Sequence, residues 1–166
     1  MRLKQWLRGS ALFAAGAIAG MLIMQPAASS QKKIAGMRLH HIGLYVKNME
    51  ESKEFYTKKL GLREAFTFKD EQGHPIDYFY ISHDTFLEIT AADAQHPAGF
   101  GHAGLWVDDL VPTVKSLQQK GVNVEDVHLG MTKARIANMY DQNGVRFELS
   151  AYPPESLQAI AMAPGK

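Results

Sequence analysis

The chain has 166 residues, of which 46% are hydrophobic and 21% are charged, and its formal net charge is +1. This length gives room for one ordinary domain, and the near balance of charge, without a basic stripe, argues against a nucleic-acid partner. Because there is no cysteine, disulfides, thiolate metal ligands, a cysteine nucleophile and a lipidated cysteine anchor are excluded, and any metal site would need nitrogen and oxygen ligands.

Residues 1–30 have the layout of a secretory signal peptide. Three basic residues precede an uncharged apolar run at 11–24, and small residues follow Pro26. A spanning helix needs about 20 apolar residues, so we expect export to the periplasm or the outside, with cleavage favoured over an uncleaved N-terminal anchor. The membrane would then be a partner only through residues 1–30. Without them the formal charge is −2, from 15 basic and 17 acidic residues. We expect residues 31–36 to form a short polar linker.

From His40 onward the sequence repeats one order of elements. HHIGLYV, from His40, and GHAGLWV, from Gly101, alternate as strands do, and an amphipathic helix pattern follows each. We expect the first helix to begin after Asn48 and to end at Gly61. The second is expected to begin after the Asp pair at 108–109 and to end at Gly121.

Three strand patterns, separated by turns, follow each predicted helix. They cover residues 62–69, 76–82 and 85–91 in the first copy, and 122–128, 134–140 and 145–152 in the second. The order βαβββ therefore occurs twice. It predicts an α+β domain over 37–152, in which two modules, about 37–92 and 100–152, form a curved, incomplete mixed β-barrel with the helices outside. The tail, 153–166, shows no pattern.

Two histidines and two glutamates occupy equivalent places in the two copies. Because side chains alternate between the faces of a strand, His41 and His102, 61 residues apart, point away from the helices. Glu88 and Glu148, 60 residues apart, do the same on the last strands. A carboxylate between apolar neighbours is costly without a cation or donors. We therefore expect these four residues to hold one divalent ion: zinc, nickel, cobalt, iron or manganese.

A purely architectural repeat is the alternative to this metal site. In that case the histidines would be polar strand residues and the glutamates would be solvated. His40 is expected to face the helix side or an edge of the sheet, in a structural role.

Several of these stretches resemble the vicinal oxygen chelate superfamily, which includes glyoxalase I, extradiol dioxygenases and bleomycin-resistance proteins. The stretches are HIGLYV, FYTKKLGL, FLEIT, GHAGLWV and DQNGVRFEL. The resemblance spans about residues 37–152. It implies paired βαβββ modules around a metal that the substrate chelates through adjacent oxygens. Sites of this superfamily form within one chain or across two, so a homodimer is left open.

Within this superfamily, glyoxalase I carries metal ligands at the four positions that His41, Glu88, His102 and Glu148 match, so the chain resembles glyoxalase I at these positions. The resemblance thus implies a metal-dependent lyase or isomerase acting on a small molecule, with Glu148 or Glu88 moving a proton between adjacent carbons. Tyr45 and Ala92 stand where glyoxalase I has an arginine and an asparagine. We therefore expect no strict dependence on glutathione.

The expected substrate pocket and two further functions complete the predictions. The pocket candidates are Tyr45, Phe86, Trp106 and Arg146, with Tyr80 as a further aromatic wall residue. One alternative function is a non-haem iron dioxygenase, with His41, His102 and Glu148 as a two-histidine, one-carboxylate triad. The other is a ligand-sequestering protein of the bleomycin-resistance type, without catalysis.

Overall fold

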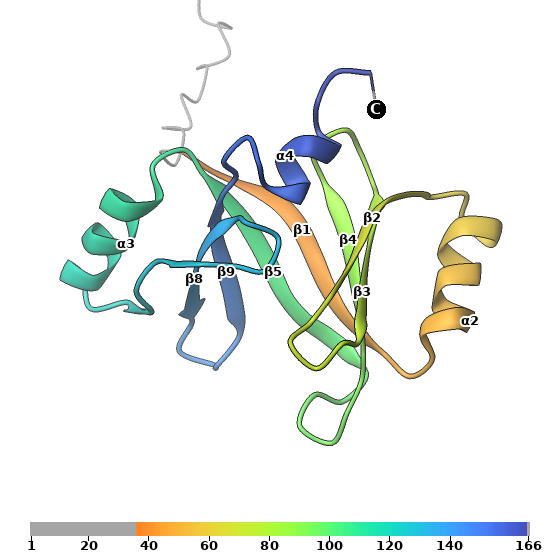
Figure 1. Cartoon of the computed structure of the whole chain (residues 1–166). Helices are drawn as coiled ribbons and strands as arrows, with labels where there is room; N and C mark the ends of the chain where they lie inside the picture. Colours follow the sequence, from red (N-terminus) through yellow and green to blue (C-terminus); the bar gives the residue numbers. More distant parts are fainter. Residues whose placement is uncertain (1–35, 166) are drawn as a thin grey trace, which may run out of the picture. The chain divides into compact units, whose positions relative to one another are not determined.

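The computed structural model describes residues 36–165 (Figure 1). The predicted signal peptide or anchor at 1–30, and all of the predicted linker except Gly36, lie outside these described residues. Among the helices that the structure does describe, none is both long and apolar enough to cross a membrane.

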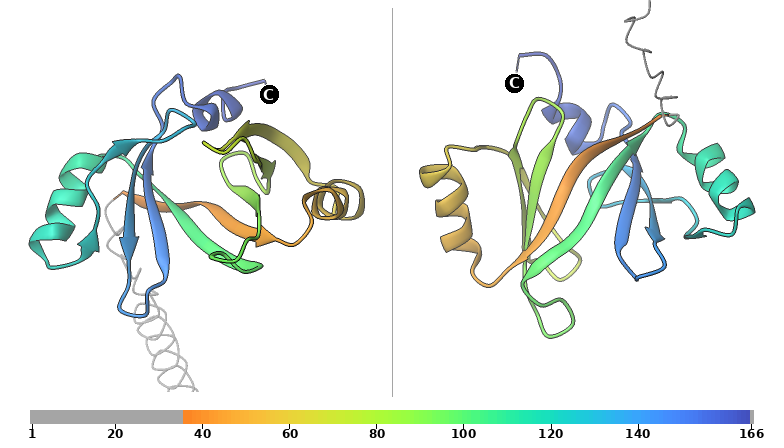
Figure 2. Two further views of the ribbon diagram at one scale, coloured as in Figure 1. Left: turned by 60° about the horizontal axis from the view of Figure 1, so that its bottom comes forward. Right: turned by 180° about the vertical axis from the view of Figure 1, so that it is seen from behind.

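One mixed sheet of nine strands forms the framework of residues 36–165. Its order is β2-β3-β4-β1-β5-β9-β8-β6, and β7 pairs with β8. The strands are β1 (Met37–Val46), β2 (Arg63–Lys69), β3 (Pro75–Tyr80), β4 (Phe86–Ala91), β5 (Gly99–Val107), β6 (Asn123–Val124), β7 (His128–Leu129), β8 (Arg135–Tyr140) and β9 (Arg146–Ala151). The sheet is curved and open, with α2 and α3 outside its two halves (Figure 2). The predicted α+β fold is confirmed.

The helices begin and end at residues that favour these roles. Their bounds are α2 (Met49–Glu54), continued by the π-helix η1 (Phe55–Lys59), then α3 (Leu110–Gln119) and α4 (Leu157–Ala161). The Asn48 side chain accepts a hydrogen bond from the backbone N–H of Glu51, as expected of a cap. Gly61 and Gly121, at φ 74° and 77°, end the first two helices in the left-handed conformation that glycine adopts without strain.

Two regions differ from the predicted elements. The strand expected at 122–128 is split into β6 and β7, because the pairing with β8 shifts by one residue between Val124, opposite Met139, and His128, opposite Ile136. The tail, which showed no pattern, contains α4. The carbonyl of Ala161 in α4 accepts a hydrogen bond from Tyr80 Oη at 2.7 Å, so the tail is packed on the first half of the sheet.

Separate apolar clusters lie between each outer helix and the sheet. Val46, Leu87 and Ile89 are buried on the side of α2. Val107 and Leu149 are buried with Leu110 and Val114 of α3. Burying such side chains favours folding by about 1.5–3 kcal/mol each. Because the buried residues of β1, β4, β5 and β9 occupy the helix-facing side of the sheet, their neighbours along each strand point to the concave side.

Candidate metal centre

The two central strands place His41 and His102 side by side on the concave face. In the antiparallel pairing of β1 with β5, His41 lies opposite Gly104 and Gly43 lies opposite His102. A Cβ atom at Gly104 would be 2.0 Å from Cε1 of His41, and one at Gly43 would be 2.3 Å from Cε1 of His102. Each imidazole therefore fills the space left by a glycine of the neighbouring strand, which explains the spacing His-x-Gly in both copies.

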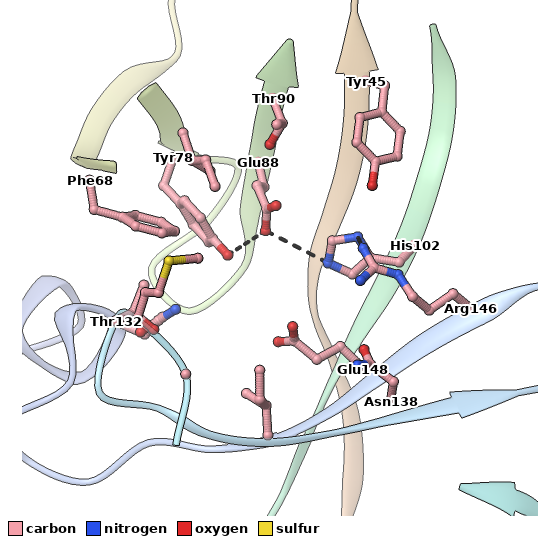
Figure 3. A pocket seen from close by; sticks show the side chains of 15 residues that line it. Tyr45, Phe68, Tyr78, Glu88, Thr90, His102, Thr132, Asn138, Arg146 and Glu148 are labelled. Atoms are coloured by element: carbon pink, nitrogen blue, oxygen red, sulfur yellow. Dashed lines mark hydrogen bonds and ion pairs between the residues drawn. The ribbon is translucent and has the colours of Figure 1, made fainter. Parts of the chain in front are cut away.

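The outer strands bring the two glutamates to the same place. In the parallel pairs β1–β4 and β5–β9, Gly43 lies beside Glu88 and Gly104 lies beside Glu148. Each carboxylate is thus in register with the glycine that makes room for an imidazole. Figure 3 shows Glu88, His102 and Glu148 directed toward one another.

Three of the four predicted ligands are close enough to share one ion. His41 Nε2 is 2.9 Å from His102 Nε2 and 3.6 Å from Glu88 Oε2, and the latter is 3.7 Å from His102 Nε2. Ligands that each bind one ion at about 2.0–2.2 Å lie roughly 3–3.7 Å from one another. The residues therefore fit a divalent ion held by His41, Glu88 and His102.

Glu148 lies beside this group of three. Its Oε1 is 3.8 Å from His41 Nε2 and accepts a hydrogen bond from Ser150 Oγ at 2.8 Å. It is not among the residues whose ligand atoms all lie within 4.8 Å of one another. Its carboxylate is thus adjacent to the candidate ion site and separate from the closest ligand set.

A buried hydroxyl holds Glu88 in place. Tyr78, which lies opposite Glu88 in the β3–β4 pairing and is 3% exposed, donates a hydrogen bond to Glu88 Oε2. Burial, followed by the charge of Glu88, raises the pKa of the Tyr78 hydroxyl well above its ordinary value. The hydroxyl therefore stays protonated and orients the carboxylate, as partners of metal ligands commonly do.

Burial also sets the charges of the ligand side chains. It lowers the pKa of His102 to about 2, so His102 is neutral, which is the form that binds metals. Burial raises the pKa of Glu88, although the hydrogen bond from Tyr78 acts in the opposite direction. A divalent cation between these groups would favour the ionised carboxylate.

A cavity of about 260 Å³ opens onto the group. It is lined by Tyr45, Phe68, Ile76, Tyr78, Glu88, Thr90, His102, Gly130, Met131, Thr132, Ile136, Asn138, Arg146, Glu148 and Gln158 (Figure 3). Two predicted pocket residues, Tyr45 and Arg146, are in this lining. The guanidinium of Arg146 donates a hydrogen bond from Nη2 to His102 Nδ1 at 2.7 Å.

The predicted aromatic wall needs correction, because Phe86, Trp106 and Tyr80 do not line this cavity. Phe86 is fully buried in the cluster that contains Ala161 of α4. Trp106 lies opposite Arg38, whose guanidinium is 3.8 Å from the centre of the indole ring. These side chains are on the expected face of the sheet. They are outside the cavity because other parts of the chain cover this face where they lie.

Four residues near the site were not assigned a functional role from the sequence. Tyr78 and Asn138 are equivalent, since each lies opposite one glutamate, and their offset of 60 residues matches that of Glu88 and Glu148. The repeat could have identified them. Gln158, 3% exposed, reaches the cavity from α4, and no repeat marks the tail.

The fourth residue, His40, lies at a register shift in the β1–β5 pairing, between Leu39 and His41. It is fully buried, it stacks on Tyr152 at 4.1 Å between ring centres, and its Nδ1 is 3.0 Å from His41 Nδ1. The expectation that it faces the helix side or an edge is wrong, because the shift turns it toward the rings around His41.

Tyr78→Phe is expected to weaken Zn²⁺ binding by about tenfold while the protein stays folded, because it removes only the hydroxyl that orients Glu88. Isothermal titration calorimetry with Zn²⁺ measures the affinity. Tyr56→Phe, which alters a hydroxyl in the cluster under α2, is the matched control. Unchanged affinity in the Tyr78 variant would show that this hydrogen bond does not support the ligand.

Comparisons with known proteins identify the family and the fold of the chain. The family model described as "Glyoxalase/Bleomycin resistance protein/Dioxygenase superfamily" matches residues 38–149. Among solved structures, methylmalonyl-CoA epimerase from Mycobacterium tuberculosis is similar, with a TM-score of 0.62 and 22% identity over 70% of this chain and 89% of that one. At this identity the likeness shows the fold alone.

Two curated relatives are similar in sequence. A probable chloroplastic lactoylglutathione lyase of Arabidopsis thaliana is 31% identical over 68% of this chain and 35% of its own length. The uncharacterized protein YwkD of Bacillus subtilis is 27% identical over 67% of this chain and 94% of its own length. The chain thus spans about a third of the length of the first relative and nearly all of the second.

Proposed function

Since the chain belongs to the glyoxalase/bleomycin resistance protein/dioxygenase superfamily, we propose that it is a metal-dependent lyase or isomerase that acts on a small substrate with adjacent oxygens. One observation carries this proposal: His41, His102 and Glu88 form a compact ligand set, while a second carboxylate, Glu148, stands beside it. A three-residue set leaves coordination positions for substrate oxygens.

His41, His102 and Glu88 would hold the ion. When bound there, a divalent ion would supply Lewis-acid stabilisation of negative charge on the substrate oxygens. Nickel, zinc, cobalt, manganese and iron all suit two imidazoles and a carboxylate.

Glu148 would act as the general base. It would take a proton from the hydroxyl-bearing carbon next to a substrate carbonyl and return it to the former carbonyl carbon, while the hydroxyl proton passes to the former carbonyl oxygen. The Ser150 hydroxyl, which donates to Glu148 Oε1, would orient the carboxylate. The other wall of the cavity, with Met131, Thr132 and Gln158, would limit the size of the substrate and exclude water.

The substrate need not carry glutathione. Tyr45 lines the cavity and its ring stacks on His96, with 4.9 Å between the ring centres. No arginine stands at this position to bind a glutathione carboxylate. The likeness to a probable lactoylglutathione lyase supports the reaction class, and we propose a smaller oxygenated substrate.

We also propose that residues 1–30 direct export of the protein, because their sequence has the layout of a secretory signal peptide.

A dioxygenase remains the second candidate, because His41, His102 and Glu88 are themselves two histidines and one carboxylate. This set replaces the triad with Glu148 expected from the sequence. The two reactions differ in what they consume: an isomerase needs no oxygen, whereas a dioxygenase takes up O₂. A pure binding protein would do neither.

The proposal is tested by proton exchange in D₂O. The full chain, loaded with Zn²⁺, Ni²⁺ or Mn²⁺, is incubated with α-hydroxy and α-oxo compounds, and deuterium uptake at carbon is followed by NMR. Exchange that requires both metal and protein supports the isomerase. Oxygen uptake by the iron-loaded protein with catechols, without any exchange, would favour the dioxygenase instead.

A further inference from the structure

A series of contacts between side-chain nitrogen atoms runs through the candidate metal centre. Arg146 Nη2 is 2.7 Å from His102 Nδ1, and His102 Nε2 is 2.9 Å from His41 Nε2. On the other side of the same ring, His41 Nδ1 is 3.0 Å from His40 Nδ1. This series of contacts ends at His40 Nε2, a buried atom without a hydrogen-bond partner among the described residues.

Arg146 determines the direction of every hydrogen bond in this series of contacts. A guanidinium only donates, so His102 Nδ1 accepts and the proton of His102 is on Nε2. His102 then donates to His41 Nε2, and His41 donates from Nδ1 to His40 Nδ1, which the Tyr152 hydroxyl also approaches at 2.8 Å. The remaining proton lies on His40 Nε2, the atom that has no partner. Reversing the direction would place two N–H groups against each other at Arg146.

This direction of the hydrogen bonds leaves Nε2 of His41 without a proton, so that it can bind a metal, but it places a proton on Nε2 of His102. His41 already carries its proton on Nδ1 and directs a lone pair from Nε2 toward Glu88 and His102. Ligation by His102 Nε2 requires its proton to be on Nδ1. That proton would then face the guanidinium of Arg146. The Arg146–His102 hydrogen bond and a metal ion on His102 Nε2 therefore exclude each other.

We propose that Arg146 is a positioning residue that couples metal binding to the binding of a carboxylate. Its hydrogen bond favours the non-ligating tautomer of His102 and so weakens metal binding, and an anion that takes the guanidinium removes this opposition. Arg146 and Glu148 line the same cavity, so the released guanidinium can pair there with a substrate carboxylate. This inference rests on the proposed function and narrows its substrate class to α-hydroxy carbonyl compounds that also carry a carboxylate, so that an anion lies beside the two chelating oxygens.

Coupling between two ligands is reciprocal. A carboxylate that removes Arg146 from His102 raises the affinity for the metal, and the bound metal raises the affinity for that carboxylate by the same factor. The enzyme would thus assemble its centre most completely when the substrate is present.

Zn²⁺ titration of the full chain by calorimetry tests the coupling, since it requires no turnover. Arg146→Met removes the donor and is expected to bind Zn²⁺ at least about tenfold more tightly than the wild type. Arg146→Lys keeps a donor-only group and is expected to stay close to the wild type. Arg135→Met, which removes an exposed arginine of β8, is the matched control for charge. Acetate is expected to tighten Zn²⁺ binding in the wild type more than in the Arg146→Met protein.

¹⁵N NMR of the histidine side chains gives an independent readout. In the metal-free wild type, His102 is expected to be the Nε2–H tautomer, and with Zn²⁺ the Nδ1–H tautomer. Equal Zn²⁺ affinities of the wild type and Arg146→Met, or an Nδ1–H tautomer in the metal-free protein, would overturn the coupling alone. Zn²⁺ binding to none of these proteins would overturn the proposed function and the coupling together.

Discussion

Glu148→Gln is expected to slow metal-dependent proton exchange at substrate carbon by at least about 100-fold, because the amide cannot accept the proton that the carboxylate takes. The variant should still fold and bind Zn²⁺, since glutamine has nearly the same shape and the three ligands of the compact set are His41, Glu88 and His102. Exchange is followed by NMR in D₂O and Zn²⁺ affinity by calorimetry.

Proton exchange and Zn²⁺ affinity together distinguish the role of Glu148 from that of Glu88. Glu88→Gln is expected to reduce both Zn²⁺ affinity and exchange, whereas Glu148→Gln reduces exchange much more than affinity. Glu50→Gln, at an exposed position in the first turn of α2, is the matched control and should change neither. Full exchange in the Glu148 variant with metal bound would remove Glu148 from the role of base.

Gly104→Ala is expected to disrupt the centre without changing any ligand. The new Cβ would be 2.0 Å from Cε1 and 2.5 Å from Nε2 of His41, a side chain with 0% exposure. The ring cannot retreat within a packed interior, so the strand or the ring must shift. Overpacking of this kind costs about 1–3 kcal/mol or more of unfolding free energy. Zn²⁺ affinity should also fall, by at least about tenfold, since His41 is displaced.

Chemical denaturation measures the unfolding free energy of the Gly104→Ala protein, and calorimetry measures its affinity for Zn²⁺. Gly43→Ala, whose Cβ would be 2.3 Å from His102 Cε1, should behave in the same way. Gly130→Ala is the control, because its nearest contact is the flexible end of Ile136 at 3.2 Å. A Gly104→Ala protein with wild-type stability and affinity would contradict the crossed arrangement of rings and glycines.

Much of this site could be predicted from the sequence because the repeat marks it. Strand alternation gives the face of each side chain, and the equivalence of the two copies relates His41 to His102 and Glu88 to Glu148. The parallel pairs β1–β4 and β5–β9 then bring these residues together. Local pattern and repeat thus carry enough information to place these four residues near one another on one face of the sheet.

The remaining features depend on contacts that no local pattern reports. Phe86 and Trp106 have the expected face, but α4 and Arg38 cover them. Gln158 enters the cavity from the tail, which belongs to neither copy. His40 is turned inward by a register shift, which arises only when β1 pairs with β5. Glu148 matches Glu88 in sequence, yet it stands apart from the compact ligand set.

The metal content of the full chain, purified without chelator or affinity tag, tests the central claim most directly. Elemental analysis is expected to find about one divalent ion per chain in the wild type and in Glu50→Gln, and much less in Glu88→Gln. Absence of metal from the wild type, even after reloading with zinc, nickel, cobalt, manganese and iron, would contradict a metal centre at His41, Glu88 and His102. Full retention of metal by Glu88→Gln would contradict the role of Glu88 as a ligand.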